Sequence, residues 1–175
     1  MAGRLFVLLL LVSAPAFGAD PAAVARLLGG YEWHPDKAAF EQLGAGTDTL
    51  LMQIAGDDSR TRLMRQRAMA ALSLYPNDKV FHWFETLVSD GQDAIMRRRA
   101  VDVMCSTFRA SRGDAVVSAV TPLLGADDAY LRVRAAVCLR EIGGATATDA
   151  LANYRRGIKA AWEAKAAGFK GTNIP

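Results

Sequence analysis

The sequence predicts an all-α protein made of short helical hairpins that stack side by side. Three segments share the pattern Met/Leu-Arg-x-Arg-Ala-x-x-x-Met/Leu, and they occupy residues 64–72, 96–104 and 131–139. In each segment apolar or small residues fall at the first, fifth, eighth and ninth positions, which form one face of an α-helix. No stretch shows the sustained apolar–polar alternation of a half-buried strand. Because the segments recur about every 33 residues, they indicate an array of repeated helical units.

Other helices are expected before, between and after these segments. Their expected ranges are 21–28, 35–43, 47–56, 79–89, 114–124 and 147–167. Each hairpin then combines one helix of this set with one repeated segment, joined by a short polar turn. Pro122 predicts a kink near the end of its helix.

Acidic residues in the turns are expected to cap the repeated helices. Their carboxylates accept hydrogen bonds from the free N–H groups of a first helical turn and suit the positive end of the helix dipole. The residues concerned are Asp57, Asp58, Asp90, Asp93, Asp127 and Asp128. Pro76 and the pair Gly143-Gly144 are expected to end the first and third repeated helices.

The first residues are expected to form a secretory signal peptide that is not part of the fold. Arg4 precedes an apolar run over residues 5–12, which is too short to span a bilayer. Ala16 and Gly18 supply the small residues expected before cleavage at Ala19. A retained membrane anchor is the alternative. We therefore expect an exported protein, periplasmic or secreted, in an oxidising compartment and without stable membrane insertion after cleavage.

The third unit resembles a known kind of helical repeat. Residues 123–151, LLGADDAYLRVRAAVCLREIGGATATDAL, run through an apolar helix end, an acidic turn, an aliphatic-Arg-x-x-Ala core and a Leu-x-x-Ile-Gly end. This order is similar to the HEAT-like repeat found in phycobilisome lyases and many bacterial proteins. Residues 88–104 match more loosely. Residues 50–72 match at the Met-Arg-x-x-Ala core, with Thr61 where the later copies have aspartate.

The resemblance implies a short right-handed α-solenoid of HEAT- or armadillo-like hairpins. We expect the array to span residues 45–167, after a signal peptide at 1–18 and an N-terminal helical cap at 19–44. Residues 168–175 are expected to form a C-terminal tail.

Paired arginines are the most distinctive feature of the repeats, and they flank the apolar stripe on both edges. The resemblance favours a structural ladder, in which Arg97 and Arg132 pair with acidic turn residues of neighbouring units. The planar guanidinium suits such pairing because it binds a carboxylate through two hydrogen bonds. The residues expected in the ladder are Arg65, Arg97, Arg132, Asp93 and Asp128.

A basic binding stripe is the alternative role for the arginines. Arg98 is predicted to point away from the apolar stripe, so it is the better candidate for contact with an anionic partner. The other candidate binding residues are Arg67, Arg99 and Arg134.

Cys105 and Cys138 lie on the second helices of successive units. Helix axes about 8–10 Å apart usually hold Cα atoms too far apart for a disulfide, unless small residues let the helices approach. Cys105 also lies outside the predicted apolar stripe of its helix. Two buried free thiols are therefore favoured, and a disulfide between the two residues stays open.

Several function classes find little support in the sequence. Its hydrophobic content of 51% is too high for a disordered chain, and its net charge of +3 does not demand a nucleic-acid partner. Its histidines, His34 and His82, belong to no HExxH motif, and neither GxSxG nor a phosphate-binding glycine loop is present. The paired aspartates suit turn caps better than metal ligands. No catalytic residue, cofactor or metal is expected.

The aromatic residues are expected to divide between core and surface. Trp83, Phe84 and Trp162 lie on apolar helix faces and are predicted to be buried. Tyr31 and Trp33 are candidates for a surface anchor.

These features predict a non-enzymatic scaffold or adaptor of the periplasm or cell envelope that binds another protein. Short solenoids present an elongated surface, which suits recognition. One alternative is an accessory lyase- or chaperone-like factor acting on a cofactor protein, as the phycobilisome-lyase resemblance suggests. Another is a binder of an anionic envelope polymer. Export argues against nucleic acid as the partner.

Overall fold

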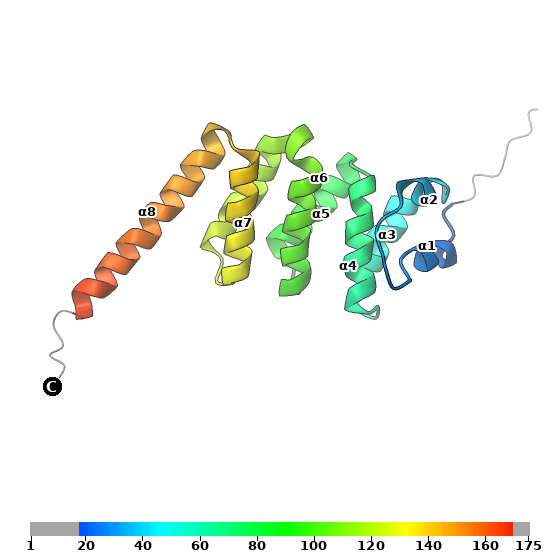
Figure 1. Cartoon of the computed structure of the whole chain (residues 1–175), viewed down its shortest axis with the longest axis horizontal. Helices are drawn as coiled ribbons and strands as arrows, with labels where there is room; N and C mark the ends of the chain where they lie inside the picture. Colours follow the sequence, from blue (N-terminus) through cyan, green and yellow to red (C-terminus); the bar gives the residue numbers. More distant parts are fainter. Residues whose placement is uncertain (1–17, 170–175) are drawn as a thin grey trace, which may run out of the picture.

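The computed structural model describes residues 18–169, and over this range the chain forms helices and no strand (Figure 1). The all-α prediction is therefore confirmed. The helices are α1 (Pro21–Leu27), α2 (Lys37–Glu41), α3 (Thr47–Gly56), α4 (Arg62–Ala71), α5 (Asp78–Asp90), α6 (Ala94–Val120), α7 (Ala129–Ile142) and α8 (Gly144–Phe169), with short 3-10 turns η1 (Leu72–Leu74) and η2 (Thr121–Gly125). Residues 1–17 of the expected signal peptide and residues 170–175 of the expected tail lie outside the described residues.

The helices pack mainly on their neighbours in the chain, α3 on α4, α5 on α6 and α6 on α7. Figure 1 shows α4, α6 and α7 side by side, with α3 and α5 behind them. Arg112 has non-helical backbone angles, φ −143° and ψ 36°, so it divides α6 into two helical segments. The second segment is the helix expected over 114–124, but it ends at Val120 and continues as η2, where Pro122 lies in the first turn.

The predicted apolar faces of the repeated helices lie in the core. Residues at the fifth position of each repeat are fully buried, and so are those at the ninth position. They are Ala68, Ala100 and Ala135, and Leu72, Met104 and Leu139, all with 0% exposure. The periodicity of the sequence therefore gave the buried face correctly.

Two of the expected aspartate caps are present, and one helix is capped differently. The carboxylates of Asp93 and Asp128 accept backbone N–H bonds at the starts of α6 and α7. Thr61, rather than Asp57 or Asp58, caps α4, because that helix begins only at Arg62. Asp57 instead accepts hydrogen bonds from the hydroxyl and N–H of Ser59, which lower the pKa of its carboxyl.

Arg97 holds the α5–α6 hairpin closed through main-chain carbonyls. Its Nε donates to the carbonyl oxygen of Val88 at 2.7 Å, and its Nη2 donates to that of Ser89 at 2.9 Å. Carbonyls at a helix C-terminus lack intrahelical partners, so the guanidinium satisfies them. Arg65 and Arg132 make equivalent bonds. Their acceptors are the carbonyl oxygens of Ala55 for Arg65, and of Ala126 and Asp127 for Arg132.

The predicted ladder is therefore wrong for Arg97 and Arg132. The Arg97 guanidinium turns back toward the end of α5, and that of Arg132 toward the turn before α7, where free carbonyls are within reach. Asp128 pairs with Arg98 instead. Of the three arginines expected in the ladder, only Arg65 reaches the aspartate of the next unit, with Nη1 3.8 Å from a carboxylate oxygen of Asp93.

Replacing Arg97 with methionine should lower the free energy of unfolding by about 2 kcal/mol, because two carbonyls lose a charged donor. Urea unfolding followed by circular dichroism measures the change. Arg62→Met, at an exposed position at the start of α4, is the matched control and should stay within about 0.5 kcal/mol of the wild type. Equal stability of the Arg97 variant and the control would contradict the conclusion that Arg97 holds the α5–α6 hairpin closed.

Cys105 and Cys138 form a disulfide between α6 and α7, so the prediction of two free thiols is wrong. Their Cα atoms are 5.7 Å apart, which a disulfide spans without backbone movement. The fully buried Ala100 and Ala135 belong to the same two helices, and short side chains let helices approach closely. Cys105 is itself buried, on the side of α6 that faces α7.

The last helix, α8, begins against α7 and then leaves it (Figure 1). Ala147 is buried, and Leu151 and Tyr154 pack partly against the core. Trp162 is 73% exposed, so its predicted burial is wrong, because α8 diverges from α7 toward its C-terminal end. None of the helices described is both long and apolar enough to cross a membrane.

Candidate binding surface

The three repeated helices expose equivalent residues on a shared surface. α4, the first segment of α6, and α7 lie side by side, so equal positions in the repeat form rows across them (Figure 1). We call this the repeat surface. Its rows are Leu63, Ile95 and Tyr130; Gln66, Arg98 and Val133; and Arg67, Arg99 and Arg134.

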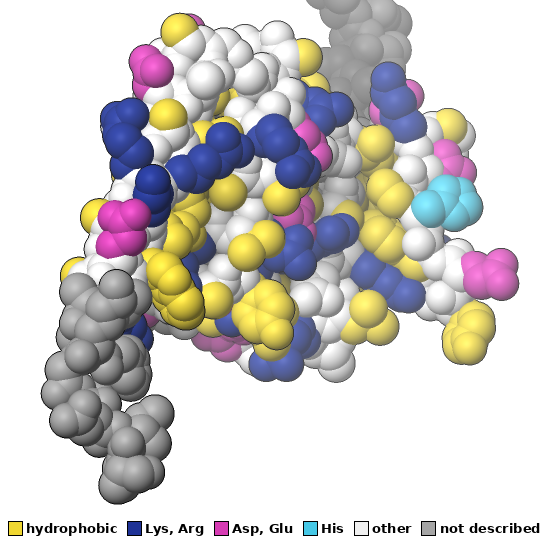
Figure 2. All heavy atoms as spheres, turned by 60° about the vertical axis from the view of Figure 1, so that its left-hand side comes forward, with side chains coloured by type: hydrophobic (Ala, Val, Ile, Leu, Met, Phe, Trp, Pro, Cys, Tyr) yellow, Lys and Arg dark blue, Asp and Glu magenta, His cyan; other side chains and the backbone are white. Residues whose placement is uncertain are grey.

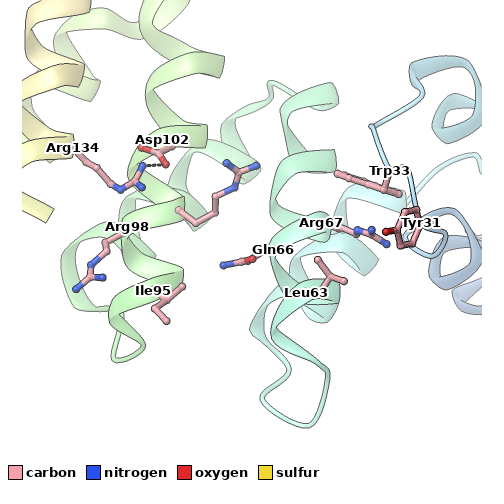
Figure 3. Close-up of a pocket in the computed structure, with 10 residues that line it drawn as sticks. Tyr31, Trp33, Leu63, Gln66, Arg67, Ile95, Arg98, Asp102 and Arg134 are labelled. Carbon is pink, nitrogen blue, oxygen red and sulfur yellow. Dashed lines mark hydrogen bonds and ion pairs between the residues drawn. The ribbon is translucent and has the colours of Figure 1, made fainter. Parts of the chain in front are cut away.

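An open depression of about 520 Å³ lies in the repeat surface (Figure 3). Tyr31 and Trp33, from the loop after α1, form its wall at the N-terminal end. The remaining lining residues are Leu63, Gln66, Arg67, Ile95, Arg98, Arg99, Asp102 and Arg134. All four candidate binding arginines therefore line the same depression. Four arginines against one aspartate make it attractive to anionic groups.

Arg67 joins the N-terminal segment to the repeats. Its Nη1 donates to the carbonyl oxygens of Leu28 at 2.9 Å and Gly30 at 3.0 Å. Its guanidinium also lies over the Trp33 ring, 5.4 Å from the centroid. The Trp33 indole in turn donates to the carbonyl oxygen of Leu27. These contacts fix the aromatic wall of the depression relative to α4.

Arg98 is held in the surface instead of pointing freely outward, which corrects the prediction from the helical wheel. Its Nε lies 2.6 Å from a carboxylate oxygen of Asp128, and its guanidinium is 4.8 Å from the centroid of the Tyr130 ring. The hydrogen bond from Arg98 lowers the pKa of the Asp128 carboxyl. Because Asp128 also caps α7, the pair orients that helix against α6.

Arg99 differs from the other arginines of the depression. Arg134 forms an ion pair with Asp102, as the dashed line in Figure 3 marks. Arg99 forms no hydrogen bond or ion pair with any residue that the structure describes. Its guanidinium is therefore the one best able to meet a ligand without breaking an internal contact.

Large hydrophobic side chains are exposed beside these arginines. Tyr31 is 99% exposed and Tyr130 is 68% exposed, and Leu63, Ile95 and Val133 are exposed as well. Sequence reasoning named the arginines but missed the apolar row. The row was visible in the repeats, because the residue just before each repeated segment is Leu63, Ile95 or Tyr130.

The described residues contain no group of three or more His, Cys, Asp and Glu side chains placed to hold a metal ion. His82 Nδ1 lies 3.0 Å from a carboxylate oxygen of Glu85 on the exposed side of α5. His34 and Pro35 lie beside a neighbouring hollow between the N-terminal segment and α6.

No protein-family model matches the chain, and no curated protein or solved structure is significantly similar to it. The resemblance to HEAT-like repeats therefore stays a prediction from the sequence.

Proposed function

We propose that this chain is a non-enzymatic protein-binding scaffold or adaptor of the cell envelope, built as a short right-handed α-solenoid of HEAT-like repeats. The observation that carries the proposal is the repeat surface. Successive units place an exposed apolar residue and an arginine at equivalent positions on adjoining helices. Such a surface lengthens with each unit, which suits an extended partner.

The composition of the repeat surface supports a protein partner. Arginine and tyrosine are enriched at the energetic centres of protein interfaces, where aromatic rings bury area and guanidinium groups pair with carboxylates. Tyr31, Tyr130 and Arg99 combine these residue types on one face. The excess of arginine favours a partner segment that carries Asp or Glu beside apolar residues.

The arginines also favour a second candidate, the binding of an anionic envelope polymer. Such binding depends on charge and weakens steeply with salt, whereas a protein partner also uses Leu63 and Ile95. No observation favours the lyase-like alternative, because Asp102, the carboxylate of the depression, is paired with Arg134.

Export is proposed from the N-terminal sequence together with the disulfide. A signal peptide would deliver the chain to an oxidising compartment, and disulfides persist mainly in such compartments. The Cys105–Cys138 bond supports this assignment.

Photo-cross-linking in intact cells tests the proposed function. A photoreactive residue at Ile95, on the repeat surface, should trap a discrete protein species. The same residue at Thr86, exposed on α5, is the control and should not. Adding Leu63→Asp should weaken the cross-link at position 95 by about tenfold, since a charge interrupts the apolar row. Equal cross-linking from both positions, or a protease-resistant polymeric product at position 95, would contradict the proposal.

A further inference from the structure

A second surface lies at the opposite end of the chain, between α7 and α8. Its floor is apolar, made by Val133, Ala136 and Val137 of α7 and by Leu151 and Tyr154 of α8. These residues line a groove of about 210 Å³. Figure 2, which brings this end forward, shows Lys and Arg side chains around exposed hydrophobic ones.

Comparison of α6 and α7 at equivalent positions of the repeat indicates which kind of contact the α7 side of the groove can make. α6 binds α7 through Arg98, Asp102, Cys105 and Arg109. Their partners on α7 or at its N-cap are Asp128, Arg134, Cys138 and Glu141, in that order. The positions of α7 that correspond to Arg98, Asp102 and Cys105 are Val133, Val137 and Arg140.

These three residues of α7 therefore occupy the places from which α6 holds its neighbour. In the part of the chain that the structure describes, no helix lies beside α7 as α7 lies beside α6; α8 diverges from it (Figure 1). Ion-pairing and disulfide residues are replaced here by two valines and an arginine. This side of α7 therefore corresponds to the side of α6 against which α7 packs. Among the described residues, however, it forms no ion pair or disulfide with a neighbouring helix.

α8 extends the same apolar face beyond the groove. Leu151, Tyr154, Ile158 and Trp162 recur every three or four residues, so they share one side of the helix. The first two line the groove, while Ile158 is 52% exposed and Trp162 is 73% exposed. A helix lying along α7 and α8 would cover both parts of this face.

Charge identifies the kind of helix that fits. Arg132, Arg140 and Arg155 line the groove, and no carboxylate does. Arg140 and Arg155 form no ion pair with any described residue. Residues 155–165 of α8 carry Arg155, Arg156, Lys159 and Lys165 against a single acidic residue, Glu163. A second copy of α8 would therefore bring net positive charge against these arginines, and like charges at an interface oppose binding. The charge pattern therefore disfavours self-association through this face.

We propose that the α7–α8 groove, together with the part of α8 that exposes Ile158 and Trp162, binds an amphipathic α-helix of another protein. The apolar stripe of that helix is flanked by Asp and Glu. The bound helix would stand next to α7 as the next helix of the array. The groove shares Val133 with the repeat surface, but it shares no residue with the depression. The inference therefore does not rest on the function proposed above.

Two synthetic helical peptides of about 20 residues, about 30 Å long, test the proposal. They share one leucine stripe, which is flanked by Glu in one peptide and by Lys in the other. Fluorescence anisotropy with the whole purified protein should show the Glu peptide binding at least about tenfold more tightly than the Lys peptide. Binding should also shift tryptophan emission to shorter wavelength as Trp162 becomes buried.

Charge reversal locates the binding site. Arg140→Glu combined with Arg155→Glu should weaken binding of the Glu peptide by about tenfold or more, and Val137→Asp should do the same by placing a charge in the groove. Arg62→Glu, at the far end of the array, is the control and should bind as the wild type does. Thermal unfolding of the Arg140/Arg155 variant, whose substitutions are exposed, should match that of the wild type.

Three results would overturn the proposal. The first is that the two peptides bind equally tightly, or that neither binds. The second is an unchanged affinity for the Glu peptide after charge reversal. The third is sedimentation that shows a dimer in which Trp162 is already buried, because a second copy of the chain would then cover the α7–α8 surface. Cross-linking at Ile95 in the Val137→Asp variant separates the two surfaces, because it should persist whether or not the groove binds the peptide.

Discussion

The Ala100→Asp variant should lose about 3 kcal/mol or more of its free energy of unfolding, the largest effect expected for a single substitution here. Ala100 is fully buried at the fifth position of the second repeat, in the helix that contacts both α4 and α7. A carboxylate there is removed from water without a partner, or takes up a proton at a similar cost. Because neighbouring helices stack through this helix, the loss weakens more than one interface.

Urea unfolding followed by circular dichroism measures this loss. Ala110→Asp adds the same charge at an exposed position of the same helix and should change stability by no more than about 0.5 kcal/mol. If Ala100→Asp unfolds at the same urea concentration as this control, the assigned helical register is wrong.

Removal of the disulfide should cost about 3 kcal/mol, the second large effect. The bond joins residues 33 positions apart, so it restricts the unfolded chain over a long loop as well as linking α6 to α7. The variant with both Cys105→Ala and Cys138→Ala should therefore unfold at a lower denaturant concentration.

Reduction provides an independent check on the same bond. The wild type should lose a similar amount of stability in the presence of a thiol reductant, while the double variant should be insensitive to it. An unfolding midpoint of the wild type that is the same with and without reductant would show that the bond does not stabilise the fold.

Periodicity predicted the helices and their buried faces because both depend on neighbouring residues of one helix. Ala68, Ala100 and Ala135 are buried as expected, and Asp93 and Asp128 cap their helices as expected. Each of these outcomes depends on local geometry, which the sequence specifies directly.

The contacts of long side chains were predicted less well. A helical wheel gives the direction in which Arg97 and Arg98 leave the backbone, but not where their flexible side chains end. Arg97 reaches carbonyls of the preceding helix, and Arg98 bends to Asp128. The sequence pattern alone did not distinguish these acceptors.

The sequence pattern also did not predict how closely neighbouring helices approach one another. The disulfide depends on how closely α6 and α7 approach, which follows from packing in three dimensions. Trp162 has the spacing of a core residue, yet it is exposed because no described helix lies against that part of α8. The spacing of apolar residues identifies the face of a helix that is suited to burial, but it does not identify what packs against that face.

The affinity of the Arg99→Glu variant tests the proposed binding function most directly. Arg99 lines the depression and makes no polar contact with described residues, so its replacement should leave the unfolding midpoint unchanged. Titration of the partner trapped at Ile95 should show binding about tenfold weaker than wild type, which corresponds to about 1.4 kcal/mol. Arg62→Glu should bind like the wild type. Wild-type affinity of Arg99→Glu would contradict the proposal that the arginines of the repeat surface recognise an acidic protein partner.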